Sequence, residues 1–140
     1  MPLCDQMVLP LDEDVCPRIL AGKRVSARQY LDALAEQGRI KAQFAAALDA
    51  FDVLATPTVG TPAIPLDHVD QTATRGGFTR TVNLLERCTL TVLNGFTEED
   101  LPSGLQLIGR AYDAGTVLRM RWAYEQATEW HNRIPSGLRD

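Results

Sequence analysis

A long helix-forming pattern over residues 26–50 places the strongest constraint on what this chain can fold into. Ser26 is followed three residues later by Gln29, the spacing of a capping box at a helix start. The residues that follow are rich in Ala, Leu, Gln, Glu and Arg, which have high helix propensity. Apolar residues then recur at helical spacing, at Ile40, Phe44, Ala47, Leu48 and Phe51. The pattern predicts one helix over about residues 27–50, with a weak point at Gly38.

The rest of the chain carries shorter helix and strand signals in alternation. Helices are expected at residues 13–21, where Gly22 ends the segment, at 78–86, and from Asp113 toward Pro135. Strands are expected at residues 51–55, 88–92 and 105–108. This order predicts an α/β fold in which helices pack on a small mixed sheet.

Local signals indicate how these elements begin, end and connect. Thr56-Pro57 is expected to end the first strand, because a residue before proline prefers extended geometry. Asn94-Gly95 is a turn signal between the last two strands, which we expect to pair antiparallel through a loop longer than a tight hairpin. The last helix has an expected apolar stripe of Val117, Met120, Ala123, Tyr124, Ala127 and Trp130.

The chain is expected to form one domain with short terminal segments. Its 140 residues fall in the size range of a single domain. Residues 1–12 show no clear period and are interpreted as a loose lead-in, residues 13–135 as the domain, and residues 136–140 as a tail. Residues 57–77 are rich in proline and glycine, which predicts a long irregular loop of the kind that often carries function.

Charge and composition exclude several classes of protein. The chain has 14 Lys+Arg against 18 Asp+Glu, for a net charge of -4, and its longest basic run is Lys23-Arg24, so nucleic-acid binding is not expected. No stretch approaches the ~20 apolar residues that span a bilayer, and the start lacks the features of a signal peptide. Cys4, Cys16 and Cys88 form no C-x-x-C pair, which favours reduced thiols in a cytoplasmic protein.

A nucleophile is hard to find among the serines. Ser26 is explained by its role as a helix cap, Ser103 lies between Pro102 and Gly104 in an expected turn, and Ser136 lies in the tail. None stands in the G-x-S-x-G motif of a nucleophile elbow. A serine also needs an adjacent base before it can act near neutral pH. We therefore predict no catalytic serine in this chain.

Bases and metal ligands are equally scarce. His68 lies in the proline-rich loop and His131 near the end of the last helix, and neither is spaced to pair with a serine. Lys41 is expected on the exposed side of the long helix, where it keeps its charge, and Lys23 is no better placed. No metal or cofactor motif occurs. A small enzyme with an unrelated site built on His68 stays open as an alternative.

Several segments, in order, resemble one family. Residues 51–58 (FDVLATPT) are followed by Phe78-Thr79 with Val82-Asn83-Leu84, then by residues 94–97 (NGFT) and 101–110 (LPSGLQLIGR), and finally by residues 123–131 (AYEQATEWH) with Pro135. These segments resemble the C-terminal portion of the amidase signature hydrolases. The resemblance implies the C-terminal part of an α/β/α sandwich, from enzymes that cleave carboxamide C–N bonds with two serines and a lysine.

The resemblance also shows what this chain lacks and where it departs. The Gly/Ser-rich segment that carries the family's serines has no counterpart here, so the isolated chain is expected to be inactive. Glu86 and Asp100 stand where many relatives have glycine, a change that matters if the backbone needs a positive φ, and Leu93 stands where they have proline. Gly76 replaces the acidic residue that binds glutamine in the transfer-RNA amidotransferase subunits, which favours a stand-alone amidase relative.

Two functional hypotheses follow from these observations. In the first, the chain is the C-terminal segment of an amidase, and a complementary N-terminal half would complete the site for a small amide substrate. Pro57, Thr58 and Thr79 would then contribute to the wall of the substrate pocket, because they follow a strand end and precede a helix. In the second, the chain is a non-catalytic α/β interaction module that forms a homodimer or binds a partner chain through exposed apolar surfaces.

Overall fold

The computed structural model describes residues 15–70 and 76–134. The helices in these ranges are α2 (Val15–Ala21), α3 (Ala27–Leu48), α4 (Gly77–Leu84) and α5 (Ala114–Gln126). The strands are β1 (Leu54–Pro57), β2 (Thr89–Phe96) and β3 (Pro102–Ile108). Short 3-10 turns are η1 (Gly22–Arg24), η2 (Leu66–His68) and η3 (Trp130–Asn132). The α/β class expected from the sequence is confirmed.

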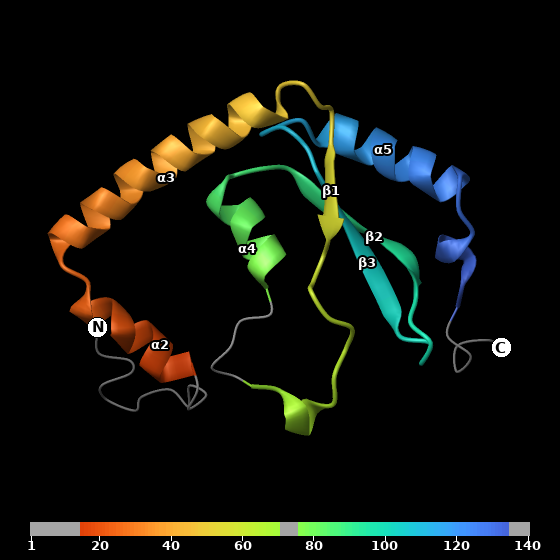
Figure 1. Cartoon of the computed structure of the whole chain (residues 1–140), viewed down its shortest axis with the longest axis horizontal. Coiled ribbons are helices and arrows are strands. Elements are labelled where there is room, and N and C mark those ends of the chain that lie inside the picture. Colours follow the sequence, from red (N-terminus) through yellow and green to blue (C-terminus); the bar gives the residue numbers. More distant parts are fainter. Residues whose placement is uncertain (1–14, 71–75, 135–140) are drawn as a thin grey trace.

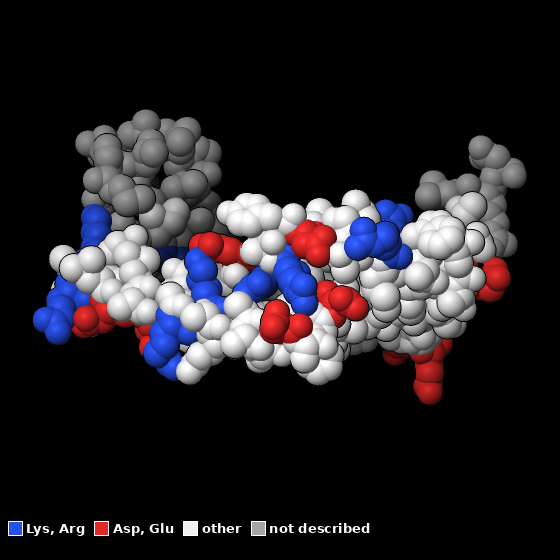
Figure 2. Space-filling model, turned by 90° about the horizontal axis from the view of Figure 1, so that it is seen from above, with Lys and Arg blue, Asp and Glu red and all other residues white. Residues whose placement is uncertain are grey.

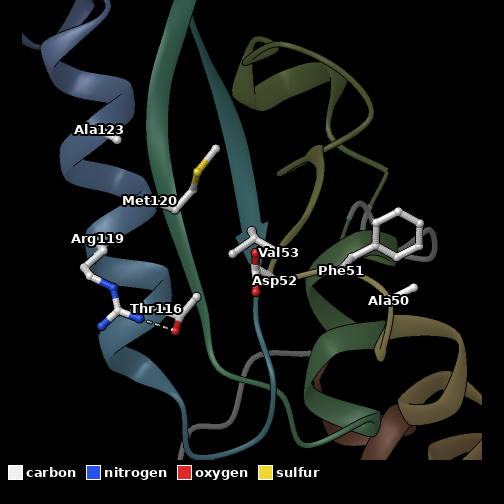
Figure 3. A pocket seen from close by; sticks show the side chains of 8 residues that line it. All are labelled: Ala50, Phe51, Asp52, Val53, Thr116, Arg119, Met120 and Ala123. Atoms are coloured by element: carbon white, nitrogen blue, oxygen red, sulfur yellow. Dashed lines mark hydrogen bonds between the residues drawn. The ribbon is translucent and has the colours of Figure 1, made fainter.

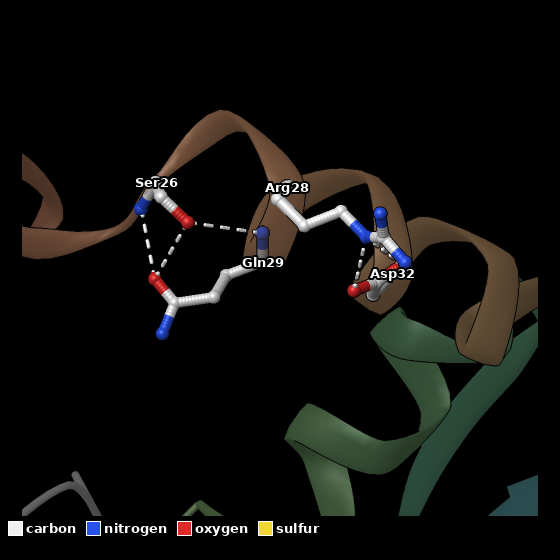
Figure 4. A network of polar contacts seen from close by, with 4 residues as sticks. All are labelled: Ser26, Arg28, Gln29 and Asp32. Carbon is white, nitrogen blue, oxygen red and sulfur yellow. Dashed lines mark hydrogen bonds and ion pairs between the residues drawn. The ribbon is translucent and has the colours of Figure 1, made fainter.

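The long helix α3 begins at the capping box that the sequence predicts. The Gln29 backbone N–H donates to Ser26 Oγ at 3.2 Å, and the Ser26 N–H donates to Gln29 Oε1 at 2.9 Å (Figure 4). One turn on, Arg28 and Asp32 form an ion pair at 3.0 Å (Figure 4). The helix passes Gly38 without a break, and it extends away from the sheet as a rod (Figure 1). Leu48, in its last turn, is its one buried residue.

The strands form a three-stranded sheet in the order β1-β3-β2. The sequence predicted a mixed sheet, but both pairings are antiparallel. The central strand β3 runs opposite to both β1 and β2. Figure 1 shows α4 and α5 on either side of this sheet. One hydrophobic cluster lies on the α5 side, where Val117 packs against Val92 and Leu107, and the other buried apolar residues in the described part of the chain are Leu48, Val82, Leu85 and Ile108.

The Asn94-Gly95 dipeptide is not the turn between the last two strands. It lies inside β2, where the register with β3 shifts between Leu93 and Gly95, and Gly95 has φ 144°. A β-bulge, like a tight turn, can require a positive φ that glycine adopts without strain. The dipeptide therefore correctly indicated an unusual backbone conformation, but that conformation belongs to a bulge. The chain reverses later, where the Thr97 N–H donates to the Leu101 carbonyl at 2.9 Å. Ser103 consequently lies in β3 and not in a turn.

The first strand and the last helix also differ from their predictions. β1 starts at Leu54 and includes Pro57, an edge position that tolerates a missing N–H. Asp113 caps α5 as expected, accepting from the Thr116 N–H at 3.1 Å. The expected stripe of α5 is only partly turned to the core: Val117 is buried, but Met120 is 43% exposed. The helix ends at Gln126, so Trp130 belongs to η3.

Glu86 and Asp100, which stand at glycine positions of the resembled family, both have left-handed backbones. Their φ angles are 53° and 62°. Each carboxylate is held by a cation: Glu86 Oε2 lies 2.6 Å from Lys41 Nζ, and Asp100 Oδ1 lies 2.8 Å from Arg133 Nη2. The Arg133 guanidinium also lies 3.9 Å from the centroid of the Phe96 ring. The loop geometry is thus kept without glycine, at the expense of backbone strain.

The described residues carry many apolar side chains at the surface, among them Tyr30 at 59%, Leu31 at 61% and Phe51 at 62% exposure. Among the described helices, none is both long enough and apolar enough to cross a membrane. On the face seen in Figure 2, acidic and basic side chains are interspersed.

Candidate functional site

The side of the sheet opposite the α5 cluster carries a row of polar side chains next to the apolar Leu54 and Ile108. Thr56, Gln106 and Thr91 stand in register across the three strands. One step along, the Thr58 hydroxyl donates to the Thr91 hydroxyl at 3.1 Å, a bond that crosses over Gly104. A Cβ on Gly104 would lie 2.8 Å from Thr58 Oγ1, so only glycine leaves room for this bridge.

Gln106 is the most unusual residue of this polar face. It is 1% exposed, and within the described chain neither its amide nitrogen nor its amide oxygen has a hydrogen-bond partner. The neighbouring Thr56 hydroxyl is also buried and unpaired. Each such group costs about 1–3 kcal/mol. The sequence analysis did not identify Gln106 or Thr91 as site residues. The hydroxyl residues Thr89 and Thr91 alternate with apolar residues, and this alternation could have indicated a polar face of the strand.

A cavity of about 270 Å³ opens where this face meets the end of β1. It is lined by Pro57, Val59, Gly60, Thr61, Pro62, Ala63, Pro102, Ser103 and Gly104. Of the three predicted pocket residues, Pro57 lines the cavity; Thr58 is not among its lining residues but is bonded to one of them, because the Thr58 N–H donates to the Gly104 carbonyl at 2.9 Å. Thr79 lies on α4, where its hydroxyl donates to the Gly76 carbonyl at 3.2 Å, and it does not line this cavity. Their role as a substrate-pocket wall stays a prediction.

The described serines have no base beside them. The Ser26 hydroxyl is used in the helix cap, and Ser103 lies in β3 at the wall of the cavity. Ser136 lies outside the described residues. Within residues 15–70 and 76–134, no hydrogen bond joins Ser26 or Ser103 to a lysine or histidine.

The candidate bases are placed away from these serines. Lys41 is not on an open side of α3 as expected: its side chain is 31% exposed and reaches the strained turn at Glu86 after α4. His68 lies in η2, with its Nε2 4.0 Å from the Asp67 carboxylate, and His131 lies in η3. No group of three or more metal-ligating side chains forms in the part of the chain that the structure describes. The arrangement can shape a pocket, but these residues form no nucleophile–base pair.

A second cleft, of about 620 Å³, lies between α5 and the segment that leads into β1 (Figure 3). Its lining residues are Ala50, Phe51, Asp52, Val53, Thr116, Arg119, Met120 and Ala123. Figure 3 shows Met120 reaching from α5 toward the side of Val53 and Asp52. The Arg119 guanidinium donates to the Thr116 hydroxyl at 2.7 Å. None of the residues predicted from the sequence as functional lies in this cleft.

Comparison with known proteins gives one consistent result. The family model described as Amidase matches residues 8–118. A glutamyl-tRNA(Gln) amidotransferase subunit from Thermodesulfovibrio yellowstonii is 35% identical over 131 residues, covering 87% of this chain and 27% of that protein. The corresponding protein of Halorhodospira halophila is 38% identical over 135 residues, covering 90% and 28%. This chain therefore spans about a quarter of the length of the curated relatives it matches.

The similarity extends to solved structures. A crystal structure of an amidase superposes with a TM-score of 0.72 at 27% sequence identity, covering 89% of this chain and 30% of that one. A glutamyl-tRNA(Gln) amidotransferase subunit from Thermotoga maritima superposes with a TM-score of 0.63 at 25% identity, covering 89% and 29%. The neighbours thus include both an amidase and an amidotransferase component, and the preference for a stand-alone amidase stays a prediction.

Proposed function

The chain belongs to the amidase family, and we propose that it is one segment of an enzyme that hydrolyses the C–N bond of small carboxamides. The observation that carries the proposal is the family match over residues 8–118, in a chain that spans only about a quarter of its relatives. In this proposal the segment contributes scaffold and pocket wall, and another polypeptide segment contributes the nucleophile and base. The location we propose is the cytoplasm.

The isolated chain is proposed to be inactive for a chemical reason. Amide hydrolysis through a covalent intermediate needs a deprotonated nucleophile, and a hydroxyl at neutral pH requires a neighbouring base. Ser103, at the cavity wall, has no such neighbour among the described residues. Hydrogen-bond donors that stabilise charge can assist this chemistry, but they do not replace the attacking group.

Pro57, Thr58 and Thr79 are proposed to shape the substrate pocket of the completed enzyme. The cavity beside Pro57 supports this role for the first two residues, because it is concave and lined by small apolar groups with Ser103 at its edge. Thr79 would contribute from α4 once a further segment extends the pocket. Gly76, two residues before Phe78-Thr79, has no side-chain carboxylate for binding glutamine, which supports a stand-alone amidase over a glutamine-dependent amidotransferase subunit.

A second candidate is a non-catalytic component that acts by association. The relatives compared with this chain are subunits by name, and this chain carries apolar side chains on its surface, among them Phe51 at 62% exposure and Trp122 at 65%. The two candidates share the requirement for a partner and differ in whether the assembly hydrolyses amides.

The test combines the chain with a complement. The part of the Thermodesulfovibrio yellowstonii protein outside the matched region is produced separately, and hydrolysis of aryl and aliphatic amides is measured for each component and for the mixture. We expect turnover only in the mixture. Turnover by the chain alone would refute the proposed division of labour; its loss in Ser103→Ala or Ser136→Ala would then identify a nucleophile in this chain, and its survival in both would point to a different site. Association without turnover in the mixture would favour the second candidate.

A further inference from the structure

We propose that the cleft between α5 and residues 50–53 is the docking site for the complementary part of an amidase polypeptide. The docked segment would bring apolar side chains to the centre of the cleft, a basic side chain to Asp52 and an acidic side chain to Arg119. The inference rests on the proposed function, in that it takes the chain to be one segment of a larger amidase, and it specifies where the rest attaches.

The shape and lining of the cleft fit a docked segment. Val53 and Met120 form its apolar centre, with the small side chains of Ala50 and Ala123 at the sides (Figure 3). Met120 is 43% exposed here, although it is a large apolar residue on a helix that packs against the sheet through Val117. Phe51, which also lines the cleft, is 62% exposed, and neighbouring exposed apolar side chains of this kind mark interaction sites.

The charges at the cleft indicate what the docked segment carries. Within residues 15–70 and 76–134 the Asp52 carboxylate has no ion-pair or hydrogen-bond partner. Arg119 donates to the Thr116 hydroxyl and also lies close enough to the Asp113 carboxylate to interact with it electrostatically. The two charges do not form a pair with each other within 4.0 Å. An unpaired carboxylate at the edge of an apolar cleft favours a docked surface that brings a cation to Asp52, and the outward-facing part of the Arg119 guanidinium can accept an acidic group there, because complementary potentials fix the register of an interface.

The length of the relatives favours a large complement over a second copy. About three quarters of each curated relative compared above lies outside the match, so the rest of the family's fold supplies the surface that would cover this segment.

The experiment measures binding instead of catalysis. The full chain is titrated with the same Thermodesulfovibrio yellowstonii complement, and hydrogen exchange maps the amides protected in the mixture. We expect protection at residues 50–53 and 116–123. Met120→Ser and Asp52→Lys should each weaken binding by about tenfold, as for central contacts of an interface. Trp122→Ser is the matched control: it removes a large exposed side chain from the same helix, outside the cleft lining, and should bind like the wild type.

The outcomes separate this inference from the proposed function. Binding through the cleft without amide turnover supports the docking site and counts against the enzyme. Turnover with no protection at residues 50–53 supports the enzyme and overturns the docking site. Equal weakening by Trp122→Ser and Met120→Ser, self-association through the cleft, or absence of binding between two folded components also overturns it. Circular dichroism of each variant establishes that α5 is intact before binding is measured.

Discussion

The threonine bridge over β3 leads to a quantitative prediction for Gly104→Ala. The new Cβ would lie 2.8 Å from Thr58 Oγ1, 2.9 Å from Thr91 Cγ2 and 3.3 Å from Thr58 Cβ. The first two distances are shorter than any normal contact, and neither neighbour is the end of a long flexible chain. The substitution therefore pushes the two threonines apart and breaks the 3.1 Å bond between their hydroxyls.

Opposing terms set the size of this effect. Overpacking of this kind costs about 1–3 kcal/mol, and the lost hydrogen bond adds about 1 kcal/mol. Against this, alanine restricts the unfolded chain and stabilises the folded state by about 0.4–1 kcal/mol. The net expectation is a loss of about 1–3 kcal/mol in the free energy of unfolding.

The assay is urea unfolding monitored by circular dichroism. The free energies of unfolding of wild type and variant are compared on condition that both have the same dependence on urea concentration. The matched control is Gly38→Ala in the middle of α3, where nothing lies within 4 Å of the added Cβ. There the better helix propensity of alanine predicts about 1 kcal/mol of stabilisation. If Gly104→Ala matches or exceeds the wild type in stability, the bridge does not have the tight geometry described here. The same geometry predicts that Thr58→Ala and Thr91→Ser, added to Gly104→Ala, restore part of the lost stability. If they restore none, the loss does not come from contact with these threonines.

Three further predictions follow from local contacts. Ser26→Ala removes the capping box of α3 and should lower helicity and stability by about 1 kcal/mol in thermal unfolding, with Arg28→Ala as a nearly neutral control. Glu86→Gly should stabilise the fold by up to about 1 kcal/mol, because relief of a left-handed backbone outweighs an exposed ion pair; no gain would show that the Lys41 contact dominates. The hydrogen bonds from Thr116 lower the pKa of Asp113, so its contribution to stability is present above the unfolded pKa of about 3.9 and is lost as pH falls through the lower folded value. Asp113→Asn should remove that part of the acid dependence, measured as the midpoint of unfolding across the acid range below neutral pH.

Local signals in the sequence predicted local structure well. The Ser26–Gln29 pair and the helix formers after it predicted α3 to within two residues, because a capping box and helix propensity depend only on neighbours in the chain. Asp113 predicted the start of α5 for the same reason. The αL geometry at Glu86 and Asp100 was foreseeable only through the resemblance, since nothing in either residue type requires a positive φ.

Features that depend on distant partners were predicted less well. Asn94-Gly95 has the same φ requirement in a turn and in a bulge, and only the pairing of β2 with β3 decides between them. The direction of Lys41 depends on the turn after α4, which lies far along the chain from α3. For the candidate site, the sequence indicated Pro57 and Thr58 at a strand end. It did not indicate that Gln106 and Thr91 lie beside them, because a sheet register brings these residues together.

The burial of Gln106 and the exposure of Met120 have a common explanation. Gln106 is buried without a partner on one side of the sheet, and Met120 is exposed on the other, and each arrangement is unfavourable for a chain that folds alone. In a larger assembly the exposed cleft would be covered, and the sheet that carries Gln106 would be held in place by contacts on both sides. Binding to the folded form alone would then add to stability in proportion to the logarithm of the complement's concentration. Association and stability are therefore linked in this chain. Val117 of α5 packs against Val92 of β2 and Leu107 of β3. A complement that docks at the α5 cleft should consequently raise the unfolding midpoint of β2 and β3 together with that of α5.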